Sequence, residues 1–125
     1  MKTSSYEEKV ITILKKEHIK FEREKAFRDL RKGFYKFDFY IPSYNICIEV
    51  DGEQHFKQIK YFQKTRQDFL KAQERDRRKN SYCLANGIKL FRIPFWEIDN
   101  IKNFWDLTNP KFKVTSKFHN DYLKP

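Results

Sequence analysis

The stretch "YNICIEVDGEQHF", residues 44–56, places several ionisable side chains directly after an apolar run. Its apolar positions alternate in the manner of a strand, and its ionisable positions gather at the strand end: Glu49, Asp51, Glu53 and His55. Carboxylates are the ligands that hard divalent cations prefer, and an imidazole exchanges a proton near neutral pH. The stretch therefore indicates metal-assisted or acid-base chemistry.

A second alternating stretch, "YKFDFYI" (residues 35–41), precedes the first and is joined to it by "PSY". Together they predict a β-hairpin whose apolar residues share one face. A single register satisfies three apolar pairs across this hairpin: Ile41 with Ile46, Phe39 with Ile48, and Phe37 with Val50.

The opposite face of the predicted hairpin is acidic. The same register places Asp38 directly across from Glu49, with Asp51 one step further along that face. Like charges that face each other destabilise a sheet, so the arrangement predicts a compensating divalent cation. We therefore expect Asp38, Glu49 and Asp51 to bind Mg²⁺, with Mn²⁺ as a substitute.

Helical spacing directs three further charged residues toward this face. Glu7 lies on the apolar stripe of the first predicted helix, and Asp76 and Lys79 lie on the inward stripe of the long one. Each also has an ordinary explanation: a first-turn acid for Glu7, and a surface ion pair for Asp76 and Lys79. His55 alone is also compatible with an ordinary loop histidine.

These side chains need a framework, and the chain reads as helix, strand, strand, strand, helix, strand, helix. Beside the hairpin, helices are predicted over residues 4–18, 63–86 and 96–107, and a strand over residues 88–93. Residues 19–27 are predicted to form a short strand or an extended arm. This order predicts an α/β fold in which helices flank a small mixed β-sheet and a crossover helix joins the last two strands.

The domain boundary is placed where the periodicity weakens. Residues 1–107 are assigned to a single domain and residues 108–125 to a basic, aromatic C-terminal extension. Within the extension, Phe112 and Phe118 are candidates for stacking on bases or for packing in the core.

Composition favours a nucleic-acid partner. The 125 residues carry 27 Lys and Arg against 17 Asp and Glu, a formal charge of +10. No apolar run approaches the roughly 18 residues that span a membrane, and the first residues lack the apolar core of a signal peptide, so we expect a cytoplasmic protein. Cys47 and Cys83 are expected to be reduced, partly buried thiols.

The segments "FDFYIPSYNICIEVDGEQHF" and "GIKLFRIP" resemble the PD-(D/E)XK nuclease superfamily. The resemblance is to its small Vsr-like branch, which includes Vsr-type mismatch endonucleases, phage-encoded restriction-like endonucleases and EDxHD homing endonucleases. It covers residues 4 to about 100. It implies a restriction-endonuclease-like three-layer core that hydrolyses DNA phosphodiester bonds with Mg²⁺.

The resemblance also implies roles for individual residues. Glu7 matches the helix acid, Asp38 the metal ligand of the hairpin, and Asp76 the acid of the following helix. Glu49 and Asp51 occupy the (D/E)-X-K segment.

One position departs from the superfamily pattern. Asp51 stands where the superfamily usually has a lysine, so either His55 or Lys79 is expected to replace that lysine. The sequence also lacks the cysteine and histidine cluster of the zinc site in Vsr mismatch endonucleases.

The expected function is that of a Mg²⁺-dependent DNA endonuclease, homing-like or restriction-like, which nicks or cuts DNA. One alternative is a nuclease specific for mismatches, nicks or junctions, because the chain contains no zinc finger or helix-turn-helix to read an extended site. Sequence specificity would then need a homodimer or the C-terminal extension. A second alternative is a non-catalytic nucleic-acid-binding domain whose acids are solvated.

Overall fold

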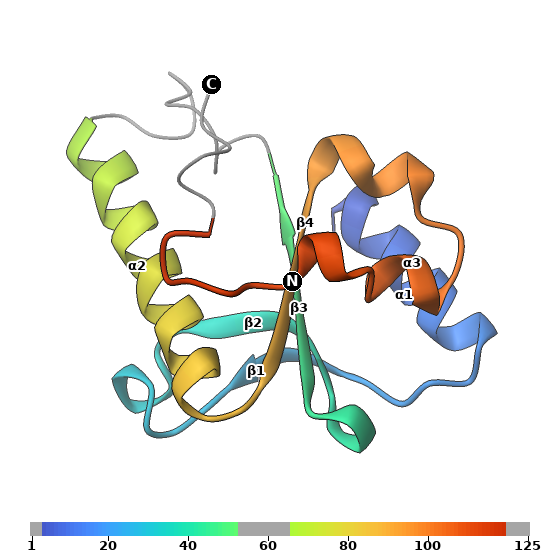
Figure 1. The fold of residues 1–125 in the computed structure, drawn as a ribbon, viewed down its shortest axis with the longest axis horizontal. Coiled ribbons are helices and arrows are strands. Elements are labelled where there is room, and N and C mark those ends of the chain that lie inside the picture. The colour runs from blue at the N-terminus through green and yellow to red at the C-terminus, as the bar shows by residue number, and fades with distance from the viewer. Residues whose placement is uncertain (1–3, 53–65, 120–125) are drawn as a thin grey trace.

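The computed structural model describes residues 4–52 and 66–119, and it has helices on both faces of a four-stranded sheet (Figure 1). The element order confirms the predicted α/β succession. Its helices and strands are α1 (Ser5–Lys16), β1 (Glu22–Ala26), β2 (Lys36–Ile41), β3 (Ile46–Asp51), α2 (Arg66–Ala85), β4 (Lys89–Pro94) and α3 (Phe104–Leu107).

The sheet is mixed, with the strand order β1, β2, β3, β4. β1 pairs with β2 and β2 with β3 in antiparallel fashion, whereas β3 and β4 are parallel. Every residue of β3 is buried. A parallel pair covered by helices on both faces explains this burial, and it means that charged side chains on β3 must find partners inside the protein.

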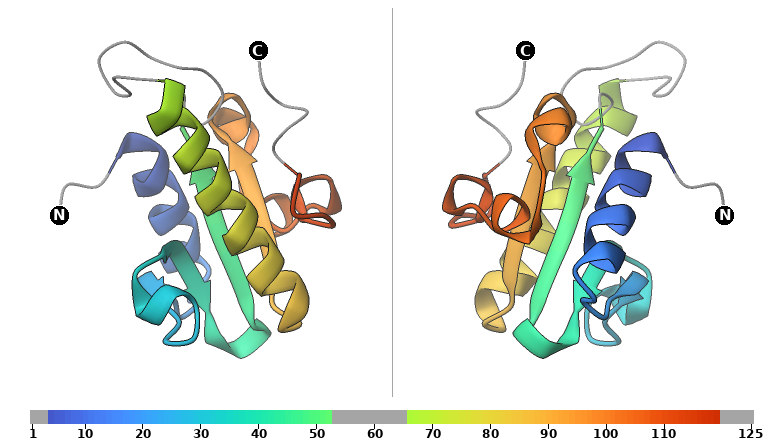
Figure 2. Two further views of the ribbon diagram at one scale, coloured as in Figure 1. Left: turned by 90° about the vertical axis from the view of Figure 1, so that its left-hand side faces the viewer. Right: turned by 90° about the vertical axis from the view of Figure 1, so that its right-hand side faces the viewer.

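Two apolar clusters fill the space between the sheet and its helices. On one face, α1 and the segments before and after α3 cover the sheet; on the other, α2 does (Figure 2). The first cluster includes Val10, Leu14, Phe39, Ile48 and Leu107. The second includes Phe37, Cys47, Cys83 and Leu90.

Helix α1 begins at a side-chain cap. The hydroxyl of Ser4 accepts a hydrogen bond from the backbone N–H of Glu7 at 3.1 Å. Val10, Ile13 and Leu14 then form the buried stripe of the helix. Because Glu7 lies one turn before this stripe, its side chain is held at the edge of the sheet.

The hairpin register is confirmed near its turn and fails beyond it. Ile41 pairs with Ile46 and Phe39 with Ile48, as predicted. The predicted pairing of Phe37 with Val50 is wrong, because the Phe37 ring packs in the cluster on the α2 side of the sheet. Since the β2 to β3 ladder ends at Phe39, the residues before it need not follow the alternation of β3.

The backbone of β1 is irregular at the same level. Arg23 pairs with Phe39 and Lys25 with Phe37, so Glu24 stands opposite Asp38. Glu24 has a φ of 54°, in the left-handed region that a non-glycine residue rarely adopts. Asp38 therefore sits where both neighbouring strands depart from regular pairing.

Helix α2 is long but strongly polar. It covers 20 residues, and its buried side includes Gln73, Asp76, Lys79 and Asn80. None of the helices in the described parts of the chain is long and apolar enough to cross a membrane. Polar side chains on the inner face of a helix need specific partners, and these partners lie at the candidate site.

The prediction of one continuous helix over residues 96–107 is wrong. A 3-10 segment, η4 (Phe95–Asn100), ends at an extended Ile101, and α3 begins three residues later at Phe104. The side chain of Asn103 accepts a hydrogen bond from Asp106 N at 3.0 Å and so caps a new helix. This local capping interrupts the helix that the spacing alone suggested.

The segment after α3 returns to the sheet. Val114 N donates to Leu90 O at 2.8 Å, and Lys113 forms a bridge with Phe91. Phe112 is buried in the α1-side cluster, whereas Phe118 is about half exposed. Both rings were candidates for stacking on bases or for packing in the core. Phe112 packs in the core, and Phe118 remains accessible.

Candidate active site at an acidic pocket

Six of the seven predicted site residues line one pocket, which has a volume of about 520 Å³. They come from α1, β2, β3 and α2, and they are Glu7, Asp38, Glu49, Asp51, Asp76 and Lys79. His55, the seventh, lies outside the described residues. The predicted convergence of first helix, hairpin and long helix is therefore observed for every member that the structure describes.

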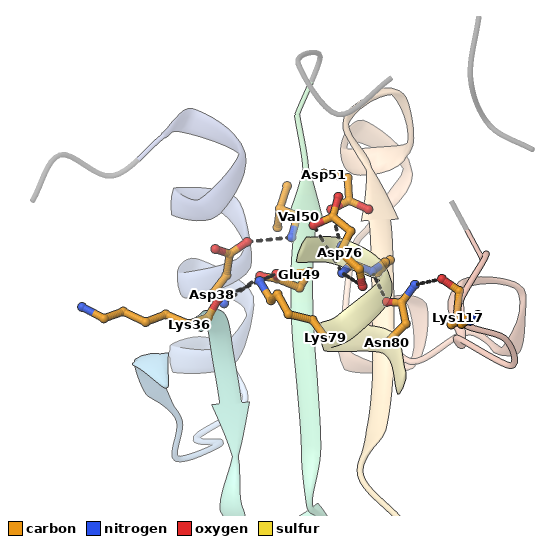
Figure 3. A network of polar contacts seen from close by, with 10 residues as sticks. Lys36, Asp38, Glu49, Val50, Asp51, Asp76, Lys79, Asn80 and Lys117 are labelled. Atoms are coloured by element: carbon orange, nitrogen blue, oxygen red, sulfur yellow. Dashed lines mark hydrogen bonds and ion pairs between the residues drawn. The ribbon is translucent and has the colours of Figure 1, made fainter. Parts of the chain in front are cut away.

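Asp38 and Glu49 replace the backbone ladder where β2 and β3 separate (Figure 3). Asp38 N donates to Glu49 Oε2 at 2.8 Å, and Val50 N donates to Asp38 Oδ2 at 2.9 Å. Each carboxylate thus accepts from the backbone of the opposite strand. The strand end is stabilised by two acids that would otherwise only repel each other.

The Asp38 carboxyl is difficult to ionise. Burial raises its pKa well above the usual range, and the negative charge of Glu49 raises it further, against the weaker opposing effects of the Val50 N–H and Lys79. For two carboxyls in contact, loss of the second proton is unfavourable because it puts two like charges side by side. A cation bound at Asp38 would favour the loss of that proton.

Lys79 supplies the positive charge next to this pair. Its ammonium contacts Glu49 Oε1 and donates to the carbonyl oxygen of Lys36 at 2.7 Å. Although burial opposes the ionisation of Glu49, the charges of Lys79 and Arg92 outweigh it and lower the pKa of Glu49. The pocket therefore holds a charged Glu49 beside an Asp38 that retains its proton more tightly.

Arg92 is a member of this network that the sequence analysis missed. Its Nη1 donates to Asp51 Oδ1 at 2.9 Å, and its Nη2 lies 3.7 Å from Asp76 Oδ1. Burial disfavours the charge of Arg92, but Asp51 and Asp76 keep the pKa of the guanidinium above its usual value. The signal was an arginine within the otherwise apolar run "LFRIP".

Asn80 connects this network to the end of the described chain. Its side-chain oxygen accepts from Arg92 Nε at 2.7 Å, and its Nδ2 donates to Lys117 O at 3.0 Å. Asn80 and Arg92 are both about 1% exposed. The segment after α3 is thereby linked through Asn80 and Arg92 to Asp51, which lines the pocket.

Glu7 occupies the rim of the pocket and pairs with Arg23 of β1. The distance from Arg23 Nη2 to Glu7 Oε1 is 2.6 Å, and both side chains are partly exposed. The ordinary explanation of Glu7 as a first-turn acid also holds, because Ser4 caps its backbone N–H. Glu7 thus belongs to the capped first turn of α1 and also lines the pocket.

The fit of a divalent cation differs among the three predicted ligands. In residues 4–52 and 66–119, no group of three Asp, Glu, His or Cys side chains is arranged to hold a metal ion. Mg²⁺ commonly takes one or two carboxylates when water and phosphate complete its shell, and Asp38 and Glu49 offer two carboxyls side by side. Both oxygens of Glu49 already accept, from Asp38 N and from Lys79, so a cation would compete with Lys79 there. Asp51 already binds Arg92 through one oxygen.

Comparison with known proteins identifies partial relatives among viral proteins. Uncharacterized protein 094L of Frog virus 3 (isolate Goorha) is 41% identical over 59 residues, and Uncharacterized protein 307L of Invertebrate iridescent virus 6 is 34% identical over 58 residues. Each match spans 46% of this chain but only 38% and 29% of the respective viral proteins. No family model and no solved structure matches the chain.

The chemistry of the pocket must therefore be derived from its own residues. A carboxyl with a raised pKa, a charged carboxylate and an ammonium lie within one small space. Such a set can hold a cation, move a proton and orient an anionic group. Two arginines position three of these acids. The buried Arg92 pairs with Asp51 and Asp76, and the partly exposed Arg23 pairs with Glu7.

Proposed function

We propose that this chain is a metal-dependent DNA endonuclease with a restriction-endonuclease-like three-layer core. The observation that carries the proposal is the contact of Asp38 with Glu49, with the Lys79 ammonium beside them, at the separated end of two strands. Within the superfamily that the sequence resembles, acids and a lysine at such a strand end hold the metal and the scissile phosphate.

The fold is compatible with this core. Helices on both faces of a mixed four-stranded sheet give three layers, and the hairpin followed by a parallel strand gives the expected order. The formal charge of +10 favours DNA as the partner, since Lys and Arg neutralise phosphates and release their counterions.

The roles of the residues follow from their contacts. Asp38 and Glu49 would hold Mg²⁺, which would polarise the scissile phosphate and lower the pKa of a bound water. Lys79 would orient a phosphate oxygen, since its ammonium already lies against Glu49. Arg92 keeps Asp51 and Asp76 in place rather than touching the substrate.

Lys79 is the better candidate for the lysine missing at position 51. It approaches the hairpin from α2 and its buried ammonium contacts Glu49, which supports a role for Lys79 beside the two acids in place of a lysine on β3. His55 remains a predicted general base, and its placement lies outside the described residues.

Cleavage of supercoiled plasmid and of branched DNA with Mg²⁺ or Mn²⁺ tests the proposal. Asp38→Asn keeps the size of the side chain and an acceptor for Val50 N, and it should reduce the rate by about 100-fold or more. Asp99→Asn is the matched control, because Asp99 is an exposed acid outside the pocket. Intact DNA in the presence of either metal would contradict the proposal.

A second candidate is a nucleic-acid-binding domain without catalysis. It is favoured by the internal neutralisation of the acids, since Lys79 pairs with Glu49 and Arg92 pairs with Asp51. Salt-dependent DNA binding that is equal in the native chain and in Asp38→Asn, without cleavage, would support this candidate.

A further inference from the structure

The turn between β1 and β2 presents a large apolar ring to solvent. Phe34 is 77% exposed and directly follows η1 (Arg31–Gly33). Leu30, which precedes η1, is buried and anchors the start of the turn. The exposed ring of Phe34 offers apolar area that contact with another molecule would remove from water.

The backbone of the turn before Phe34 is strained. Three consecutive residues have a positive φ: Arg31 at 48°, Lys32 at 54° and Gly33 at 80°. Gly33 N donates to Leu30 O at 3.0 Å, and Phe34 N donates to Arg31 O at 2.9 Å. Only the glycine adopts such a φ without cost, and strain of this kind concentrates at binding and catalytic sites.

The turn forms part of the wall of the acidic pocket. Phe34 and Tyr35 line that pocket together with Asp38 and Lys79. The two rings lie edge to face, with centroids 6.4 Å apart. The exposed ring therefore lies at the pocket and not on an unrelated part of the surface.

A basic surface begins at the other side of the same turn. Arg31, Arg77, Arg78, Lys117 and Phe118 line a shallow hollow of about 640 Å³ that extends across α2. Glu74 lies 3.6 Å from each of Arg77 and Arg78, which leaves the surface with an excess of positive charge. The guanidinium of Arg77 and the ammonium of Lys117 also lie over the ring of Phe118, at 5.3 and 4.9 Å.

One contact joins the acidic pocket to the basic surface. The guanidinium of Arg31, which lines the basic surface, stacks on Tyr35, which lines the acidic pocket, at 5.5 Å from the ring centroid. A polyanionic chain can thus run from the cations of α2, over this pair, to the acids of β2 and β3. The aromatic ring at the end of that path is Phe34.

We propose that Phe34 stacks on an unpaired nucleobase at the mouth of the acidic pocket, while the basic surface across α2 binds the phosphates of the same strand. This inference rests on the proposed function and specifies its substrate class: DNA with an unpaired or single-stranded segment next to the bond that is cut. In an intact duplex both faces of each base are already stacked, so a protruding ring gains contact only where a base is unpaired.

Nucleic acid fits this combination better than an acidic peptide does. Every nucleobase offers a flat face to an aromatic ring, and each nucleotide adds one phosphate for a cation. Carboxylate side chains could also bind to the cations of this surface but would leave the ring of Phe34 in water. The pairing of ring and cations along one path is therefore the deciding feature.

Fluorescence of 2-aminopurine in single-stranded and fully paired oligonucleotides, measured in EDTA, tests the inference without cleavage. Phe34→Ala should weaken single-strand binding about 5- to 100-fold and abolish the quenching of the stacked base, with no change for the duplex. Phe34→Trp should restore both. Arg77→Ala or Arg78→Ala should lower the slope of affinity against salt by about one and leave the quenching in place.

Trp105→Ala is the matched control, since Trp105 is 83% exposed on α3 and lines neither the acidic pocket nor the basic surface. The inference is overturned if Phe34→Ala binds and quenches like the native chain, if Trp105→Ala loses as much, or if the native chain binds no oligonucleotide. Binding that depends on Phe34 without any metal-dependent cleavage would uphold the binding site and defeat the nuclease proposal. Cleavage unaffected by Phe34→Ala would do the reverse.

Discussion

The side chains of Asp38 and Glu49 each accept a hydrogen bond from the backbone of the opposite strand at the open end of the hairpin. The carboxylate of Glu49 accepts from Asp38 N at 2.8 Å, and the carboxylate of Asp38 accepts from the next residue after Glu49 at 2.9 Å. The two acids therefore terminate the β2 to β3 ladder and open the sheet at the same point. Structure and chemistry therefore depend on the same pair, and substitution of Asp38 separates the two.

Replacing Asp38 by asparagine should stabilise the protein at neutral pH while it abolishes catalysis. The pKa of Asp38 is raised in the folded state, so its contribution to stability is present below its ordinary pKa and is lost as the pH rises through the folded value. Asparagine removes the repulsion from Glu49 and keeps an acceptor for Val50 N. Urea unfolding at pH 7 should show a gain of about 0.5 kcal/mol, the order of a cross-strand charge pair.

The same comparison has an internal control in pH. At pH values below the ordinary pKa of Asp38, the native carboxyl is protonated and the gain from asparagine should disappear. A gain that is constant over the whole pH range would point to packing instead of charge.

Divalent cations should displace a proton from Asp38. Because burial and Glu49 raise the pKa of this carboxyl, a cation must compete with the proton, and its affinity should increase as the pH rises. Titration calorimetry with Mn²⁺ in two buffers of different ionisation enthalpy should show proton release of up to about one per ion. Asp38→Asn should lose this release and Asp99→Asn should keep it. Binding independent of pH would exclude Asp38 as a ligand.

Local patterns predicted most of the framework. Alternation in β2 and β3 gave their pairing near the turn, and the spacing of α1 and α2 directed Glu7, Asp76 and Lys79 toward the pocket. These features depend on residues close in sequence, where period and chain direction determine which side chains share a face.

The features that were missed depend on distant or unusual pairings. Arg92 reaches Asp51 because β4 lies parallel to β3, a neighbour 41 residues away that no local period reveals. The Phe37 side chain lies on the α2 side of the sheet next to Glu24, which has a left-handed backbone. No glycine or asparagine at position 24 indicates this conformation. Gly33 marks the turn before Phe34 in the sequence, but the positive φ of Arg31 and Lys32 has no such signal, since both are ordinary surface residues by type.

Removing the positive charge of Lys79 should strongly destabilise the fold. Lys79→Met leaves Glu49 buried without its main counter-charge, and the loss of one partner from a buried pair costs about 3 to 5 kcal/mol. Combining Lys79→Met with Glu49→Gln should recover a large part of this loss, which denaturant unfolding of the double-mutant cycle can measure. An exposed pair provides the matched control: Lys25→Met, which removes the partner of Glu22, should cost less than about 1 kcal/mol.

The pH dependence of these variants has a defined sign. The pKa of Glu49 is lowered in the native chain, so the stability that it contributes is present above its ordinary pKa and is lost as the pH falls through the folded value. Without Lys79 this loss should begin at a higher pH. Identical acid unfolding of native chain and Lys79→Met would show that the pair carries no such stability.

The segment after α3 should prove necessary for the stability of the domain. Phe112 is buried in the apolar cluster on the α1 side of the sheet. Val114, two residues later, hydrogen-bonds to β4. Phe112→Ala should therefore lower the free energy of unfolding by about 3 kcal/mol, the cost of a large apolar truncation in a core. Phe118→Ala is the matched control, because it removes the same type of side chain where the ring is about half exposed. It should cost less than about 1 kcal/mol. Equal effects of the two substitutions, measured by denaturant unfolding, would place Phe112 outside the core.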